Sequence, residues 1–465
     1  IFGGCNYNIV GSAGALTGIL ASFVFNNGAE LLPMLAIITG VFVLIAYFLK
    51  LEKYLVFIPS SVVHGFTLGV GFILALSQLN FAFGLENVPK HKEFIENVIA
   101  SISMTGQTHL PTLGVFIVFL AGMFILARRI KAIPSAIILT PIGIFLGYLS
   151  VKGMLPFGVE TLGERFGAIQ AQVVNLGKMH ISTDLVKAAL TVTIVAILET
   201  MLCGKVADSM TGTRFNKSKE MRALGIANIG SGLFGGLPAT AVLARTSLNI
   251  RSGATNKISQ GVNSIFVLII SIIFLSGFSY LPLAVVAAIL CFTAVRMIEV
   301  HHFKQMWQYD KKNFLVAMVA GFFTVYIDPV IGILVATSLA LLMFAESISR
   351  GLFEIRANDK KGVLLTTITD TKTPILPVET STVVYTFKGA LNYVSGESHL
   401  KRLQTIRNSY KVIIIRMKEL TRLDIDGALI LNEILQELRV ENKIVYVTGV
   451  SPHIRESLKL SKEYF

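Results

Sequence analysis

Long apolar runs separated by short polar loops constrain this chain more than any other feature of its sequence. A helix needs about 20 predominantly apolar residues to cross the hydrocarbon core of a bilayer. Several stretches before residue 350 meet or approach that length. We therefore predict a polytopic α-helical membrane protein, with spans over residues 31–49, 57–80, 111–127, 134–149, 184–203, 259–278, 281–297, 313–327 and 329–346.

The composition changes along the chain. Charged residues make up only 15% of the 465 residues, whereas soluble domains carry about a quarter. We predict a transmembrane domain over 1–350, a linker over 351–376 and a small soluble domain over 377–465. The last part alternates strand patterns, such as TVVYTFK and KVIIIRM, with the helical spacing of GALILNEILQELRVE, which is typical of an α/β domain.

The positive charges indicate an orientation in a membrane. The net charge is +13, but the basic residues of the first 350 lie between apolar spans, so we expect a lipid bilayer rather than a nucleic acid as the partner. One set of alternate loops holds 17 Lys and Arg, and the other set holds 5. By the positive-inside rule the richer set, and the C-terminal domain that follows it, lie in the cytoplasm. We expect a plasma membrane or bacterial inner membrane.

Two glycine-interrupted segments, around 11–25 and 223–250, indicate an internal repeat. Phe2-Gly3-Gly4 before the first is echoed by Phe234-Gly235-Gly236 in the second, an offset of 232 residues. Pro59 and Pro282 align at an offset of 223. In inverted-repeat transporters the substrate lies near the bilayer midplane, where the N-termini of two broken helices meet.

These two segments predict an anion site. A helix N-terminus presents unpaired N–H groups and carries about half a positive charge. Small side chains would let a ligand reach that backbone, although they would equally allow close packing of helices. The predicted substrate-binding residues are Gly11, Ala13, Gly14, Ala15, Ala239, Thr240, Ala241 and Arg245.

Two charges stand beside apolar runs, where a charge costs at least about 2.5 kcal/mol at the bilayer centre. Glu199 could couple transport to a proton or another cation; a structural ion pair with a nearby Lys or Arg is the alternative. Cys203, one turn on, offers no hard oxygen to sodium, which favours a proton. Arg245 could balance a bound anion, or it could reach toward the cytoplasmic interface.

The block from Glu199 to Lys257, including SGLFGGLPATAVLARTSLN, resembles the sulfate permease (solute carrier 26) family, and LDIDGALILNEILQEL resembles a STAS domain. The resemblance implies two inverted seven-span repeats that form core and gate domains. It implies that Glu199 is the carboxylate of the eighth span and Arg245 the anion-site arginine of the tenth. Glutamate at that position resembles the proton-coupled sulfate and dicarboxylate members.

Two departures from the family accompany this resemblance. The first two spans are absent, so we expect the chain to be a fragment that does not transport alone. Asp424-Ile425-Asp426-Gly427 stands where phosphorylatable relatives have serine, so we expect no phosphorylation switch in that loop.

The expected function is secondary active transport of an inorganic anion, with sulfate favoured, as proton symport or exchange by an elevator-like motion. Bicarbonate or a C4-dicarboxylate, a passive anion channel or motor, a nucleobase permease and a non-transporting sensor are the alternatives. We expect no enzyme activity or cofactor, because the sequence lacks a hydrolase triad and a nucleotide-binding motif. We expect no metal, because Cys5, Cys203 and Cys291 do not have the spacing of metal ligands. A homodimer and a cytoplasmic protein partner for the STAS domain are expected.

Overall fold

The computed structural model describes residues 2–89, 91, 93–130, 133–167, 182–358, 364–369, 382–407 and 410–460. Contacts within the chain divide it into two units, Ile1–Ser338 and Leu339–Phe465. The division falls inside one long helix, α16 (Pro329–Ser349). Parts of the predicted linker and of the predicted start of the STAS domain, 359–363 and 370–381, lie outside the described residues.

Each predicted span corresponds to a helix. Among the described residues, seven helical stretches are long and apolar enough to cross a membrane. Local signals set the ends of the helices, as in α9 (Thr183–Thr211), where Ser182 caps the first turn and Gly212 ends the last turn with a positive φ of 70°. The helices of the predicted spans are α2 (Leu32–Phe48), α3 (Ser60–Leu76), α6 (Leu110–Arg129), α7 (Ser135–Val151), α9 (Thr183–Thr211), α12 (Ile258–Phe278), α13 (Leu283–Met297), α15 (Lys311–Tyr326) and α16.

The two interrupted segments are broken, as predicted. In the first, a short strand, β1 (Val10–Gly11), precedes helix α1 (Gly14–Asn27). In the second, helix α10 (Lys217–Leu233) ends, and the chain runs through strand β2 (Thr240–Ala241) into helix α11 (Leu243–Arg251). The remaining short helices of this unit are α4 (Leu79–Phe83), α5 (Phe94–Ser103), α8 (Leu162–Phe166) and α14 (Val300–Tyr309), with 3-10 turns at Ala29–Leu31, Leu51–Phe57 and Thr105–Gln107.

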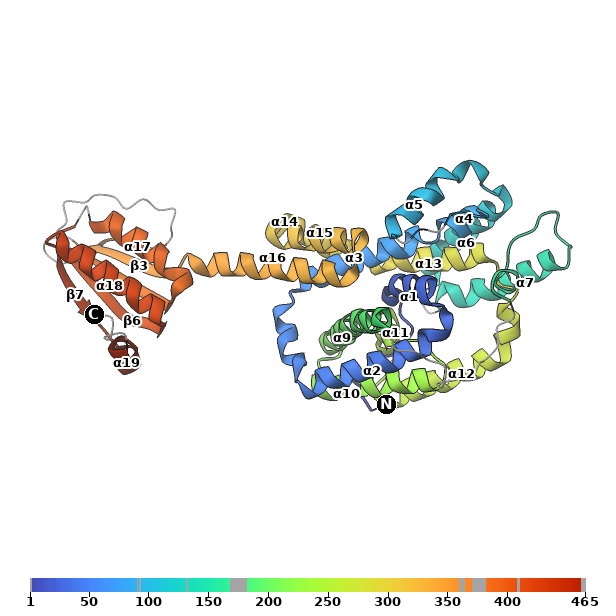
Figure 1. Cartoon of the computed structure of the whole chain (residues 1–465), viewed down its shortest axis with the longest axis horizontal. Coiled ribbons are helices and arrows are strands. Elements are labelled where there is room, and N and C mark those ends of the chain that lie inside the picture. Colours follow the sequence, from blue (N-terminus) through green and yellow to red (C-terminus); the bar gives the residue numbers. More distant parts are fainter. Residues whose placement is uncertain are drawn as a thin grey trace. The chain divides into compact units, whose positions relative to one another are not determined.

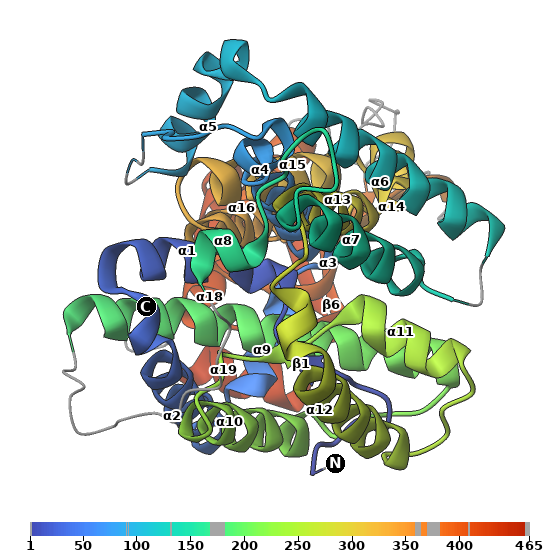
Figure 2. The same ribbon diagram turned by 90° about the vertical axis from the view of Figure 1, so that its right-hand side faces the viewer.

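The helices pack as two groups (Figure 2). The first group contains α1, α2, α9, α10 and α11. Its most extensive contact joins α2 to α10, where a Cβ on Gly40 would lie 2.6 Å from the carbonyl oxygen of Gly225. Small residues at such crossings let helix backbones approach closely within a membrane.

The second group contains α3, α4, α6, α13 and α15. Helix α3 packs along α15, where a Cβ on Gly65 would lie 2.1 Å from the carbonyl oxygen of Ala317. Helix α13 packs against α6. Helices α3 and α13 follow the aligned prolines Pro59 and Pro282, so they hold equivalent places in the two predicted repeats. Each of them packs against a helix of the other repeat, which is what two repeats related by a two-fold axis would give. The inverted repeat itself stays a prediction.

The second unit contains β3 (Leu352–Asn358), β4 (Leu364–Ile368), β5 (Thr382–Leu391), α17 (Tyr393–Arg407), β6 (Val412–Leu423), α18 (Ile425–Val440), β7 (Ile444–Thr448) and α19 (Pro452–Leu460). Its five strands form one sheet with the order β4-β3-β5-β6-β7. Strands β5, β6 and β7 run parallel, and β3 pairs antiparallel with β4 and β5. Helices α17 and α18 pack against each other (Figure 1).

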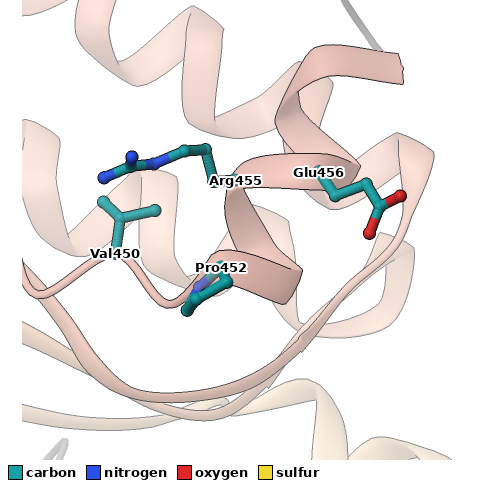
Figure 3. Close-up of a pocket in the computed structure, with 4 residues that line it drawn as sticks. All are labelled: Val450, Pro452, Arg455 and Glu456. Atoms are coloured by element: carbon teal, nitrogen blue, oxygen red, sulfur yellow. The ribbon is translucent and has the colours of Figure 1, made fainter.

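The predicted strands and helix of the α/β domain are present, and the sheet extends further toward the N-terminus than expected. Strands β3 and β4 belong to it although they lie within 351–376, the predicted linker. Alternate residues of β5 and β6, such as Val383, Tyr385 and Ile413, are buried in the core. A hollow beside the start of α19 is lined by Val450, Pro452, Arg455 and Glu456 (Figure 3).

Candidate functional site

The two broken segments meet in space. Strands β1 and β2 pair antiparallel, with Val10 opposite Ala241 and Gly11 opposite Thr240. The amide of Val242 then donates to the carbonyl oxygen of Ile9 at 3.1 Å. This pairing brings together two segments that are about 230 residues apart in the chain, as the sequence predicted.

Each strand leads into a helix N-terminus without a side-chain cap among the described residues. Ala13 precedes α1 with extended backbone angles, φ −114° and ψ 144°, and Val242 precedes α11 with φ −113° and ψ 119°. The first amides of a helix have no partner within the helix. Uncapped first turns, such as those at Gly14 and Leu243, therefore suit an anion, which N–H groups and the helix dipole both favour.

Arg245 adds a side-chain charge to this pair of helix ends. It is exposed in the first turn of α11, and its Nη1 lies 2.8 Å from the point that a Cβ on Gly11 would occupy. The guanidinium therefore lies over the backbone of β1, in a place open only because residue 11 is glycine. The geometry joins the predicted arginine to the first broken segment, across the strand pair.

The start of α1 also faces the second helical group. A Cβ on Gly14 would lie 3.4 Å from Cδ2 of Leu74 on α3 and 3.7 Å from the sulfur of Met297 on α13. Ala13 and Ala15, on either side of Gly14, are buried. The small residues of this segment thus lie where the two helical groups meet.

In the second segment, two of the predicted backbone donors already have protein partners. The amide of Ala239 donates to Oδ1 of Asn228 at 2.8 Å, and the amide of Ala241 donates to Oγ1 of Thr200 at 3.2 Å. The hydroxyl of Thr240 donates to the carbonyl oxygen of Ala196 at 2.9 Å. Residues 239–241 therefore hold β2 in place, and the uncapped donors of this segment belong to the first turn of α11.

Polar residues that the sequence reasoning missed build this frame. Besides Thr200 and Asn228, Thr246 accepts from the amide of Ile9 at 3.2 Å. Buried Glu220 accepts from the side-chain amide of Asn8 at 2.8 Å, which fixes the segment before β1. Polar groups inside a membrane span are costly unless they have partners, and that rule would have drawn attention to Thr200 and Asn228.

Glu199 lies on α9, directly before Thr200. Its Oε2 is shielded from solvent and has no hydrogen-bond partner within the described part of the chain. The alternative reading, an ion pair with a nearby Lys or Arg, is not found among those residues. A buried carboxylate oxygen without a partner is costly as an anion and is stabilised when it takes up a proton.

The membrane part and the C-terminal part of this chain each match a known protein family. Residues 1–320 match the sulfate permease family and residues 373–463 match the STAS domain. A Bacillus subtilis protein named "Putative sulfate transporter YvdB" is 27% identical and covers 100% of this chain and 87% of its own length. The bicarbonate transporter BicA of Picosynechococcus is 24% identical, over 96% of this chain and 80% of its own length.

A solved structure shows the same fold. Murine Slc26a9, an anion transporter in the inward-facing state, aligns with a TM-score of 0.80 over 99% of this chain and 80% of its own chain, at 14% identity. The match over residues 1–320 covers more than half of the sequence. The chain therefore belongs to the sulfate permease family, whose members are membrane anion transporters rather than enzymes, and carries a C-terminal STAS domain.

Proposed function

We propose that this protein carries out secondary active transport of a small inorganic anion, with sulfate as the favoured substrate. The observation that carries the proposal is the pairing of β1 with β2, which sets two uncapped helix N-termini and Arg245 around one place. The oxygens of sulfate would accept from first-turn amides of α1 and α11 and from the guanidinium. The similarity to a protein named as a sulfate transporter supports this choice of anion.

Glu199 is proposed as the coupling group. A proton on its side chain would remove the cost of burying a carboxylate whose Oε2 lacks a partner, so protonation and movement of the loaded site would be linked. In this scheme a proton enters with the anion and is released on the other side. Exchange of one anion for another remains the alternative mode.

The movement is proposed to be of the elevator type. The first helical group would carry the anion site past the second, because α1 and α11 both pack on α9. A Cβ added to Gly14 of α1 would meet only apolar atoms of the second group, Cδ2 of Leu74 and the sulfur of Met297, and an apolar boundary suits a sliding surface.

Bicarbonate is the second candidate substrate, since the BicA relatives resemble nearly the whole chain. The test is uptake of radiolabelled sulfate, bicarbonate and succinate into liposomes that contain the purified full-length protein, with and without an inward proton gradient. Sulfate uptake that rises with the gradient supports the proposal. Uptake of bicarbonate alone assigns the second candidate, and uptake of none of the three contradicts both.

The topology is also proposed, with residues 1–350 in the plasma or bacterial inner membrane and the STAS domain in the cytoplasm. The excess of Lys and Arg in one set of loops supports it. A homodimer and a cytoplasmic partner of the STAS domain belong to the same proposal. In a variant without the three native cysteines, Lys304→Cys and Lys152→Cys, made one at a time, should react with an impermeant maleimide from opposite sides of the membrane. Labelling of both from the same side would contradict the topology.

A further inference from the structure

Two histidines and a glutamate from separate elements meet beside the start of α3. His64 lies in the second turn of α3, Glu299 lies between α13 and α14, and His302 lies in the first turn of α14. Nδ1 of His64 is 2.9 Å from Oε2 of Glu299, and Nε2 of His302 is 3.7 Å from the same oxygen. The two imidazole rings stack with centroids 4.6 Å apart.

A hydrogen bond between His64 and Glu299 explains only part of this arrangement. His302 places a second ring nitrogen near the same carboxylate oxygen, at a distance of 3.7 Å that is too long for a hydrogen bond. Imidazole nitrogen and carboxylate oxygen together form the ligand set that zinc and neighbouring transition metals take in proteins.

The distances are close to those of such a site. One ligand atom from each of the three residues lies within 4.8 Å of the others. Metal–ligand distances of about 2.0–2.2 Å in a tetrahedral site place the ligand atoms about 3.3–3.5 Å apart. Closing the difference requires a rotation that takes one imidazole out of the ring stack, because the lone pair of an imidazole nitrogen lies in the ring plane and one ion cannot lie in both planes of a stacked pair. His302, whose side chain is 50% exposed against 19% for His64, is the residue free to make it.

We propose that His64, Glu299 and His302 bind a divalent transition-metal ion, represented here by Zn²⁺. Three protein ligands leave a fourth position for water, as in zinc sites that remain open to solvent. Glu299 supplies the negative charge, and neutral imidazoles supply the other two bonds.

The ion would tie the start of α3 to the junction of α13 and α14. Met297, whose sulfur lies 3.7 Å from the position of a Cβ on Gly14, lies two residues before Glu299. Both sides of the metal site border loops of the set rich in Lys and Arg, so the topology proposed above puts it at the cytoplasmic surface. Binding of the ion does not depend on the proposed transport activity.

The test is Zn²⁺ binding to the purified full-length protein in detergent, after chelator treatment and removal of any affinity tag. Competition with a chromophoric chelator should give one equivalent of zinc per chain. His64→Gln, Glu299→Gln and His302→Gln should each weaken zinc binding at least about tenfold, because each removes one ligand. His301→Gln, on the exposed neighbour of His302, is the matched control and should leave the affinity unchanged.

Two further measurements separate this site from other ligands. Size-exclusion chromatography and circular dichroism report whether each variant is folded. Because glutamine is a conservative replacement, we expect all of the variants to fold. Co²⁺ in place of Zn²⁺ should show the visible bands of nitrogen and oxygen ligands without a thiolate charge-transfer band, which would indicate one of the three cysteines. The absence of stoichiometric zinc, equal losses in His301→Gln and His302→Gln, or a thiolate band would each overturn the proposal.

Discussion

The guanidinium of Arg245 lies over Gly11, with Nη1 2.8 Å from the position of a Cβ at residue 11. One residue belongs to β1 and the other to α11, so the pair joins the two broken segments at the proposed anion site. A side chain at residue 11 would therefore have to displace the charge.

We predict that Gly11→Val raises the KM for sulfate at least about threefold, because its methyl groups push the guanidinium away from the helix ends. Liposome uptake at varied sulfate concentration measures the effect. Gly114→Val is the matched control, since a Cβ there meets open space. An unchanged KM in Gly11→Val would show that the position of the guanidinium is unimportant.

Arg245→Ala should weaken sulfate binding by about tenfold or more, because charge-assisted hydrogen bonds to an anion are stronger than neutral ones. Arg245→Lys should lose less sulfate affinity than Arg245→Ala, because lysine keeps the positive charge although it lacks the planar, bidentate guanidinium. Calorimetric titration of the purified protein with sulfate measures the dissociation constants. Arg251→Ala, at the other end of α11, is the control, and an equal effect there would assign the loss to overall charge.

Glu199→Gln should abolish the dependence of uptake on a proton gradient and spare sulfate binding, because glutamine mimics the protonated acid. Gradient-driven uptake and calorimetric binding are measured on the same preparation. Glu86→Gln, in an exposed loop, should behave as the unchanged protein. Gradient-driven uptake that survives in Glu199→Gln would remove Glu199 from the mechanism.

The spans could be predicted because membrane helices follow from length and apolarity alone, and the echo of Phe2-Gly3-Gly4 in Phe234-Gly235-Gly236 was enough to predict which two segments meet. The roles of individual residues in β2 could not be predicted. That Ala239 donates to Asn228 and Ala241 to Thr200 depends on how α9 and α10 pack against β2, which spacing along the chain does not record.

In the C-terminal unit, strands β3 and β4 could not be predicted from the sequence for a similar reason. LFEIRAN and LLTTI are short, and each becomes a strand because β5 or β3 offers an edge to pair with. Local propensity for strands depends strongly on such neighbours. The segment TVVYTFK is predicted as a strand because it is rich in β-branched residues, and the five residues LLTTI give a shorter pattern.

Thr200→Val should lower the thermal stability of the protein and weaken sulfate binding together. The change removes the acceptor of the Ala241 amide and a hydrogen-bond partner of Thr240, whose Oγ1 lies 3.0 Å from that of Thr200. A buried amide without a partner costs about 1–3 kcal/mol. Thr191→Val, on the same helix, is the control. A melting temperature and a sulfate affinity that both stay unchanged would show that this bond does not hold β2.

The STAS domain should lose stability in acid through one buried histidine. His399 is 1% exposed, and its Nδ1 lies 2.6 Å from the hydroxyl oxygen of Tyr385. Burial, assisted by the positive charge of Arg402, lowers the pKa of His399 to about 3. An unfolded histidine titrates near an ordinary pKa of about 6.5, so between these two pH values the unfolded chain takes up a proton that the folded domain does not.

The free energy of unfolding should therefore fall as the pH decreases from about 6.5 toward 3, by up to about 1.4 kcal/mol per pH unit from this group. Urea unfolding of the fragment 339–465 and of its His399→Gln variant, at several pH values, isolates the contribution as the difference between the two curves. Glutamine can still accept from the hydroxyl of Tyr385, so the variant should fold. His453→Gln, at an exposed position, should keep the steep dependence. If His399→Gln and the unchanged fragment lose stability in parallel, the histidine is not the group that takes up the proton on unfolding.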